Sequence, residues 1–358
     1  MSHVFISYVR ENVTEVERLR DVLQAYGVST WIDRHDIRAG CRWQDAIRNA
    51  IASGAFFLAC FSKEYVTKET SYMNEELTLA IEELRKRPTT RAWFIPILLS
   101  QCDIPDRSIG AGETLSAIQA VALYEDFQTG VTKILSAISP DSARIHELII
   151  QLEDPSARVR VRAADDLGKI GRTAEAAIPA LVRALKDEHV TVRGVAADSL
   201  GKIGLPSENV IVALLRIGND GSNYGTQHAI EAIRKFGKSA VPTLIKYINS
   251  DRFQATLALR EIGEHATEAV PELIRVLEED QVSFADQALG RIGDPRAIPA
   301  LIRVYKKVIN SSNDAEKHFP VIALAKVGEP TTVTHSYAQA AEVAKRVVEK
   351  WEKENKES

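Results

Sequence analysis

The chain has 358 residues, enough for roughly two domains, and 45% of them are hydrophobic while 26% are charged. Its formal net charge of −4 gives no electrostatic case for nucleic acid or an anionic membrane as the main partner. The cysteines show no metal-ligand spacing, and no apolar run is long enough to cross a bilayer. The run MSHVFISYVR enters a strand-like pattern at once. We therefore expect a cytoplasmic protein with no signal peptide, membrane contact or metal site.

The first 138 residues alternate between two kinds of segment. Five apolar runs have the composition of strands, at 4–7, 28–32, 55–61, 93–99 and 120–123. Helical patterns separate most of them, or follow the last one, at 13–26, 43–52, 72–85 and 127–138. Alternating strands and helices imply right-handed crossovers and a parallel sheet covered on both faces. The sequence therefore predicts a five-stranded flavodoxin-like α/β domain.

In such a doubly wound sheet, ligands bind at the carboxyl ends of the strands where the strand order reverses, between strands 1 and 3. The loop after the first strand contains Tyr8 and Arg10, and the helix after the third contains Tyr72 and Glu76. An aromatic ring, a guanidinium and a carboxylate in one crevice can hold a flat ring, a phosphate and a sugar. The sequence lacks GxGxxG after a strand, GxxxxGK[ST], HExxH and GxSxG, which argues against dehydrogenases, P-loop enzymes, zinc proteases and serine hydrolases.

The second part of the chain is repetitive. A phrase of the type LGKIG recurs at intervals of 26 to 35 residues and ends at Gly171, Gly204, Gly237, Gly263, Gly293 and Gly328. A phrase of the type AIPAL follows most of these glycines. Proline suits the first turn of a helix, and glycine suits the residue just past a helix end. Each unit thus predicts two short helices, which must stack on neighbouring units to bury their apolar faces in a solenoid.

Two features interrupt this pattern. Val212 stands where the other units have proline, and the interval between Gly237 and Gly263 is the shortest, so we expect one irregular helix pair. The charged segment 336–356 predicts a helix that caps the solenoid. The resulting division is a first domain over 1–138, a linker over 139–143, a solenoid over 144–330 and a charged C-terminal helix over 331–358.

Charged residues recur near the turns of the repeats. They are Arg160, Arg162 and Arg193, with Asp154 and Asp187. Because acids accompany the arginines, we interpret them as a ladder of structural ion pairs rather than a phosphate site.

Several phrases of the first domain occur in the order and at the intervals of a known family. They are HVFISYVREN, WIDRHDIRAG, FFLACFSKEYV, TSYMNEELTLA and FIPILL. At these residues the chain resembles a TIR domain over about 3–138. The repeats resemble HEAT repeats over about 144–330, in particular the short bacterial type first noticed in phycobilisome bilin lyases. The whole chain therefore looks like a bacterial fusion of a TIR domain with HEAT repeats.

The resemblance to TIR domains implies roles for particular residues. In catalytic members a glutamate on the helix after strand 3 carries the chemistry, and Tyr72-Met73-Asn74-Glu75-Glu76-Leu77 gives Glu76 that place. Glu75 points about 100° away around the helix. The resemblance also places Tyr8 and Arg10 by the nucleotide, with Trp31 and Tyr72 beside the nicotinamide ring.

The segment after the second strand is read in two ways. Asp33 is taken as a substrate-binding residue, although aspartates also shape turns. The residues Asp36, Ile37, Arg38, Ala39 and Gly40 correspond to the loop through which TIR domains contact one another. Both an enzyme and a non-catalytic scaffold would use this loop for assembly, so its presence does not distinguish the two functions.

The activity expected from the resemblance is cleavage of the nicotinamide–ribose bond of NAD+, by hydrolysis or cyclisation, with NAD+ as substrate and no cofactor. We expect activation by self-assembly through TIR–TIR contacts, which can extend into a filament. The HEAT solenoid would sense a protein trigger or drive assembly, in prokaryotic defence against phage. The alternative is a non-catalytic TIR scaffold for protein–protein signalling. A bilin lyase activity would rest on the solenoid alone and would leave the TIR domain without a role.

Overall fold

The computed structural model describes residues 3–31, 43–52, 55–68, 70–86, 93–217, 223–279, 284–309, 314–330 and 336–355. The chain divides into two compact units, Met1–Glu147 and Leu148–Ser358, each of which is described here by itself. The division falls within helix α6 (Pro140–Gln151). Residues 140–143, which we expected in a linker, form the first turn of this helix.

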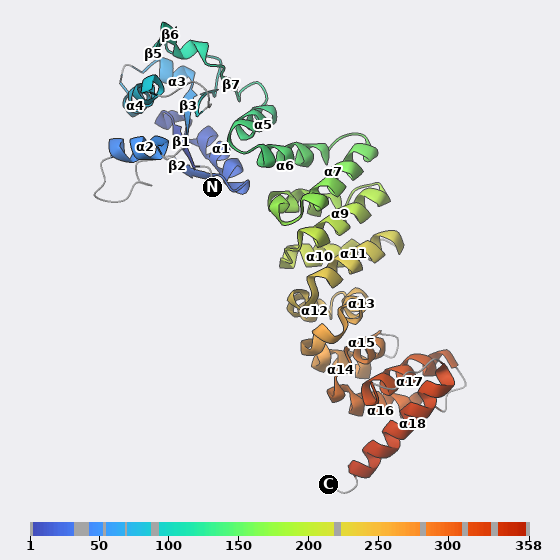
Figure 1. Ribbon diagram of the computed structural model, residues 1–358. Helices are drawn as coiled ribbons and strands as arrows, with labels where there is room; N and C mark the ends of the chain where they lie inside the picture. Colours follow the sequence, from blue (N-terminus) through green and yellow to red (C-terminus); the bar gives the residue numbers. More distant parts are fainter. Residues whose placement is uncertain are drawn as a thin grey trace. The chain divides into compact units, whose positions relative to one another are not determined.

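The first unit is built on one parallel sheet with the strand order β2-β1-β3-β4-β7 (Figure 1). The strands are β1 (His3–Ser7), β2 (Ser29–Trp31), β3 (Phe56–Phe61), β4 (Phe94–Leu98) and β7 (Val121–Ala122). Every neighbouring pair is parallel, and Phe5 lies in register with both Trp31 and Phe57. The predicted five-stranded flavodoxin-like sheet is therefore confirmed, and its strand order reverses between β1 and β3.

Alternation along the strands sends side chains to two cores. Val4 and Ile6 pack on one face with helices α1 (Val13–Ala25) and α5 (Phe127–Ile138). Phe5 packs on the other face with helices α2 (Trp43–Ala52) and α4 (Tyr72–Lys86). Strand β3 is buried along its whole length because helices cover both faces.

Short elements after β3 and β4 were not predicted from the sequence. Helix α3 (Lys63–Val66) begins at Ser62, whose side chain accepts a hydrogen bond from the backbone N–H of Tyr65. A small antiparallel pair, β5 (Ser108–Gly110) and β6 (Glu113–Thr114), lies between β4 and β7. These elements have too few residues for a periodic pattern to show.

Helix α6 is fastened to the first unit through a buried histidine. The Nδ1 atom of His146 lies 2.7 Å from the hydroxyl of Tyr26, and its Nε2 atom lies 3.3 Å from the carbonyl of Gln128. The rings of Tyr26 and His146 meet edge to face. Burial lowers the pKa of His146, which favours the neutral ring.

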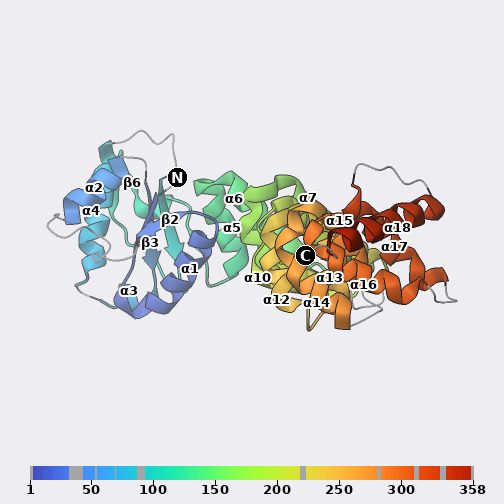
Figure 2. The same ribbon diagram turned by 90° about the horizontal axis from the view of Figure 1, so that it is seen from below.

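The second unit is a solenoid of paired helices (Figures 1 and 2). The first helices of the pairs are α8 (Ile178–Ala184), α10 (Glu208–Ile217), α12 (Val241–Tyr247), α14 (Val270–Glu279) and α16 (Ile298–Val308). The second helices form a continuous layer of α7 (Ala157–Ile170), α9 (Val190–Ile203), α11 (Asn223–Phe236), α13 (Arg252–Ile262), α15 (Ala285–Ile292) and α17 (Asp314–Gly328). Helix α18 (Tyr337–Glu354) packs on α17 and ends the stack, as predicted for the capping helix.

The recurring glycines end helices as the sequence predicted. Gly171, Gly204, Gly237, Gly263 and Gly293 each follow a second helix with φ between +57° and +76°. Gly328 differs, because it is the last residue of α17 and its φ is not positive. The pair after Gly237 consists of the seven-residue α12 and the eleven-residue α13. Since α8 also has seven residues and α15 has eight, short helices are not confined to the pair that the spacing predicted to be irregular.

The first glycine of the LGKIG phrase has a different role. A Cβ atom on Gly201 would lie 2.9 Å from the Cα of Ala232 in the next second helix, and one on Gly290 would lie 2.8 Å from the Cα of Ala323. Such distances leave no room for a side chain. These glycines therefore allow neighbouring repeats to pack backbone against backbone.

The predicted ion-pair ladder is confirmed at one pair, Arg160 with Asp187. Arg160 is buried and donates from Nε and Nη2 to the two carboxylate oxygens of Asp187, at 2.7 and 2.8 Å. Arg193 donates to the carbonyl of Asp187, at 2.9 Å. The paired arginine and aspartate thus connect one repeat turn to the next, which is a structural role.

Candidate functional site

A cavity of about 410 Å³ lies at the carboxyl end of β1, where the strand order reverses. Its walls come from the segment after β1, from the segment after α3 and from the first turn of α4. The lining residues are Tyr8, Val9, Arg10, Lys68, Thr70, Ser71, Tyr72, Met73 and Glu75. Its volume lies within the range of small-molecule sites, and its position is the one that the sheet topology predicts for a ligand.

The wall after β1 is held by a buried polar network. The short 3₁₀ segment Arg10–Asn12 closes with a bond from the Asn12 N–H to the carbonyl of Val9. Ser62, at the end of β3, donates to the Asn12 side-chain oxygen at 2.7 Å. Lys68 pairs with Glu11, and this hydrogen bond holds the pKa of the Glu11 carboxyl below its usual value. Arg10 is thereby presented at the cavity from a segment that β3 supports.

The first turn of α4 is fixed from the other side. The Asn74 side-chain oxygen accepts hydrogen bonds from Tyr65 at 2.8 Å and from the guanidinium of Arg107 at 2.9 Å. Arg107 also donates to the hydroxyl of Thr78 at 3.1 Å. Contacts from α3 and from the segment before β5 thus set the rotation of the helix that carries Tyr72, Glu75 and Glu76.

Glu76 is the buried carboxylate at this end of the sheet, with 8% of its surface exposed. Its Oε2 atom accepts a hydrogen bond of 2.7 Å from the Ser7 hydroxyl. Ser7 is the last residue of β1 and immediately precedes Tyr8 in the cavity wall. The neighbouring Glu75 is exposed and lines the cavity, so the two adjacent carboxylates occupy different environments, as the helical geometry predicted.

The cavity combines aromatic and charged groups. Tyr72 is 61% exposed, and with Tyr8 it offers ring surface to a flat ligand. Arg10 and Lys68 are cations suited to a phosphate, and the Thr70 and Ser71 hydroxyls can donate or accept hydrogen bonds. The arrangement can hold a ligand with an aromatic ring, hydroxyls and phosphates beside a carboxylate.

Comparisons with known proteins agree with this geometry. The model of the TIR domain family matches residues 4–135. The model of HEAT repeats matches residues 145–234, and that of the PBS lyase HEAT-like repeat matches 251–279 and 287–307. The chain is a TIR domain followed by HEAT repeats.

Comparison with solved structures shows weak similarities. An engineered protein is 19% identical and matches with a TM-score of 0.30, over 57% of this chain and 97% of the other. The complex of CpcE and CpcF of phycocyanin lyase from a Nostoc species is 22% identical and matches with a TM-score of 0.28, over 57% of this chain and 94% of the other. No curated protein matches the chain.

The TIR domain brings together four of the six residues predicted for catalysis and substrate binding. Tyr8, Arg10 and Tyr72 line one cavity, and Glu76 lies beside it through its bond to Ser7. Trp31 is half-buried against the core under α2 and α4, with its ring 6.2 Å from that of His3, and it is not among the described residues that line the cavity.

Two predictions fall outside the residues that the structure describes. They concern Asp33 and the loop Asp36, Ile37, Arg38, Ala39 and Gly40. Conversely, the sequence did not single out the lining residues Lys68, Thr70, Ser71 and Glu75 as part of the site. The helical period indicated only that the side chains of Glu75 and Glu76 point in different directions. Lys68 lines the cavity because it follows the short helix α3, which the sequence did not predict.

The described part of the chain contains no cluster of three His, Cys, Asp or Glu side chains placed to hold a metal ion. Within the same residues, no helix has the length and apolar character needed to span a membrane.

Proposed function

We propose that the TIR domain cleaves the nicotinamide–ribose bond of NAD+, with the carboxylate of Glu76 next to the ribose. The observation that carries this proposal is the buried Glu76 carboxylate, oriented by the Ser7 hydroxyl at the edge of a cavity where the strand order reverses. A TIR domain alone does not decide the matter, because the family contains adaptors as well as enzymes.

The chemistry that this arrangement supports is glycosidic. Nicotinamide leaves with the electron pair of the C–N bond and becomes neutral, so no general acid is needed for the leaving group. The ribose that remains has oxocarbenium character, and a nearby carboxylate stabilises its positive charge. Ser7 donates to Oε2 of Glu76 and thereby fixes the orientation of the carboxylate. Water then gives ADP-ribose and a proton, whereas attack by an adenine nitrogen gives a cyclic product.

Binding would use the groups that line the cavity. The ring faces of Tyr72 and Tyr8 suit the cationic nicotinamide ring, an attraction worth on the order of 1 kcal/mol at an exposed site. Arg10 would hold the diphosphate by its planar fork. In this proposal Trp31, at the end of β2, and Asp33 contribute to substrate binding, and the loop 36–40 contributes to contact with a neighbouring TIR domain.

Regulation would come from assembly. TIR domains commonly self-associate, and head-to-tail contacts between identical copies propagate into filaments when they do not close. In this proposal a protein trigger binds the HEAT repeats, or the repeats themselves hold several copies together, and the TIR domains become active. The setting proposed is the cytoplasm of a prokaryote and its defence against phage.

The second candidate is a non-catalytic scaffold that recruits other TIR domains. Its support is the exposed first turn of α4 with Tyr72, a surface that a partner could cover. A scaffold needs the assembly loop but not the Glu76 carboxylate. The two candidates therefore differ in the consequence of one isosteric substitution.

That substitution is Glu76→Gln, compared with Glu82→Gln on the same helix. Glu82 makes an exposed ion pair with Arg48 at 3.4 Å, so its variant controls for loss of a helix carboxylate. Nicotinamide release from NAD+ is measured by chromatography with concentrated full-length protein. We expect at least a hundredfold loss in Glu76→Gln and none in Glu82→Gln. Equal release by wild type and Glu76→Gln would contradict the proposed role, and no release by any form at high concentration would favour the scaffold.

A further inference from the structure

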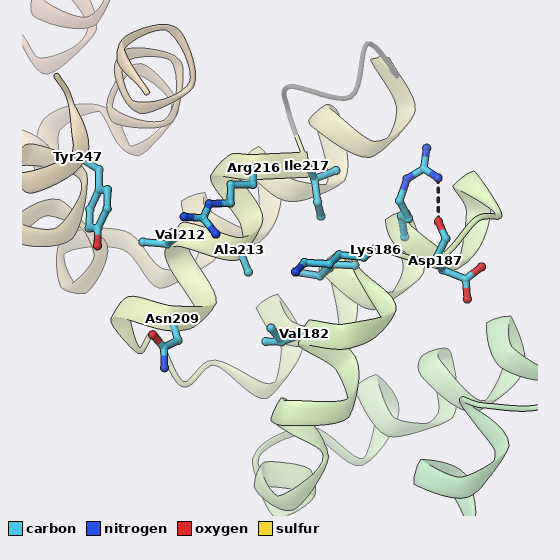
Figure 3. Close-up of a pocket in the computed structure, with 11 residues that line it drawn as sticks. Val182, Lys186, Asp187, Asn209, Val212, Ala213, Arg216, Ile217 and Tyr247 are labelled. Atoms are coloured by element: carbon cyan, nitrogen blue, oxygen red, sulfur yellow. Dashed lines mark hydrogen bonds between the residues drawn. The ribbon is translucent and has the colours of Figure 1, made fainter. Parts of the chain in front are cut away.

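The HEAT repeats contain a second cavity, of about 580 Å³, that the proposed function does not use (Figure 3). It lies between the first helices α8, α10 and α12. Its lining includes the apolar Val182 and Val212, the cations Lys186 and Arg216, and the polar Asn209 and Tyr247. Its volume is that of a site for a small organic molecule.

The lining is positively charged. Lys186, just past the end of α8, and Arg216 on α10 extend into the same space (Figure 3). Within the described parts of the chain neither side chain forms an ion pair. Arg193 also lines the cavity, but its Nη1 donates to the backbone carbonyls of Asp187 and Glu188. Lys186 and Arg216 are therefore the two cations that the cavity offers to an anionic ligand.

Among the described residues of the lining, Asp187 is the one acid, and it does not offset this charge. Both carboxylate oxygens of Asp187 accept hydrogen bonds from Arg160, and Oδ1 also accepts one from the backbone N–H of His189. At the opposite end, Glu208 accepts hydrogen bonds from Lys246 at 2.6 Å and from the Tyr247 hydroxyl at 2.8 Å. The nearby acids are therefore engaged by groups other than Lys186 and Arg216.

The cavity lies at the repeat that departs from the sequence pattern. Proline is the second residue of α8, α12, α14 and α16, whereas Val212 at the matching place is the fifth residue of α10. A proline inside a helix would remove a hydrogen bond and clash with the preceding turn, at a cost of about 3 kcal/mol. Valine allows α10 to begin earlier, and this additional turn carries Asn209 to the cavity.

The remaining walls suit the flat part of a ligand. Val182 of α8 faces Val212 and Ala213 of α10 across the space, and the ring of Tyr247 stands at one end (Figure 3). Because the Tyr247 hydroxyl is bonded to Glu208, its ring is held in place. Inorganic phosphate alone would leave this apolar surface exposed, whereas a phosphate that carries a heterocyclic ring would cover it.

We propose that this cavity is a binding site for a nucleoside phosphate, with Arg216 and Lys186 on the phosphate groups, Tyr247 against the base and Asn209 hydrogen-bonded to the ligand. The site lies wholly within the HEAT repeats and is independent of NAD+ cleavage by the TIR domain. It would allow the solenoid to respond to a small anionic molecule as well as to a protein.

The test is calorimetric titration of the full-length protein with ADP, and separately with inorganic phosphate. We expect saturable ADP binding that weakens about tenfold in Arg216→Gln and in Lys186→Gln, the loss of one charge-assisted contact each. Both side chains are exposed, so these variants should fold. Arg183→Gln is the matched control, since Arg183 lies on α8 and pairs with Glu153 instead of lining the cavity.

Two more variants separate the alternatives. Tyr247→Ala should weaken ADP binding and leave phosphate binding unchanged, because only the base contacts the ring. Arg10→Gln in the TIR cavity should leave solenoid binding intact. The proposal is overturned if wild-type protein shows no saturable binding at millimolar ADP, or if only Arg10→Gln reduces it. Equal affinities for ADP and phosphate, or competition by a polyglutamate peptide at the affinity of ADP, would also overturn it.

Discussion

The TIR domain and the HEAT repeats form cavities by different means. In the TIR domain, the cavity collects residues distant in sequence, such as Tyr8 and Tyr72, because parallel strands end at one edge of the sheet. In the solenoid, each helix contacts its neighbours in the chain, and the larger cavity lies where one repeat departs from the pattern at Val212. The reversal of strand order therefore locates the cavity of the TIR domain, and a departure from the repeat pattern locates the cavity of the solenoid.

The largest expected effect concerns the core of the TIR domain between the sheet and helices α2 and α4. Phe57 is fully buried in β3 and stacks between Phe5 and Phe94. Phe57→Ala should lower the free energy of unfolding of the TIR domain by about 3–5 kcal/mol. Because the solenoid has its own core, its transition in differential scanning calorimetry should stay in place. A joint shift of all transitions would show that the two units unfold as one.

A second prediction addresses the ladder between repeats. Arg160→Met should lower the melting temperature of the solenoid by roughly 5 °C, because Asp187 would remain half-buried without its bidentate partner. Arg183→Met, which breaks an exposed pair with Glu153, should change it little. If the two variants behave alike, the ladder does not stabilise the solenoid.

The same pair predicts a pH dependence. Burial raises the pKa of Asp187, but the hydrogen bonds from Arg160 and from the His189 N–H lower it by more, so the net shift is downward. The pair therefore adds stability above the unfolded-state pKa, and this stability is lost as the pH falls through the lower, folded-state pKa. Thermal melts at successive pH values should show a smaller acid-side loss for Arg160→Met than for wild type. If the melting temperatures of the two proteins fall in parallel as the pH is lowered, groups other than Asp187 cause the loss of stability in acid.

The smallest effects distinguish the two glycines of the LGKIG phrase. Gly201→Ala should cost about 2 kcal/mol, because its Cβ would meet the backbone of Ala232. Gly204→Ala should cost about 1 kcal/mol from its left-handed φ of +72°, since only the Lys202 carbonyl oxygen, at 3.9 Å, lies near its Cβ position. Urea denaturation of the two variants measures both values. The reverse order would mean that the repeats can separate slightly at little cost.

The sequence predicted most of the fold because both regions carry strong periodic signals. The unbroken apolar run of β3 and the glycine and proline positions of the repeats specify elements locally. The pair β5 and β6 and the helix α3 escaped prediction, since four residues or fewer show no period. The consequence of Val212 also needed the structure, because the loss of a proline does not by itself say how much earlier a helix begins.

The candidate site was predictable in part. Strand order and helix phase together indicated that Tyr8, Arg10 and Tyr72 share a crevice and that Glu76 turns away from Glu75. The bond between Ser7 and Glu76 was not predictable, because it depends on the rotation of α4 that Asn74, Tyr65 and Arg107 set across three elements. Long-range hydrogen bonds of this kind leave no periodic trace in a sequence.

Nicotinamide release from NAD+, followed over a series of protein concentrations with wild type beside Glu76→Gln, is the decisive test of the proposed function. This function requires that wild-type activity per molecule rises with concentration, because assembly activates the TIR domain, and that Glu76→Gln stays inactive throughout. Activity that persists in Glu76→Gln, or wild-type protein that stays inactive even when its TIR domains are forced to oligomerise, would contradict it.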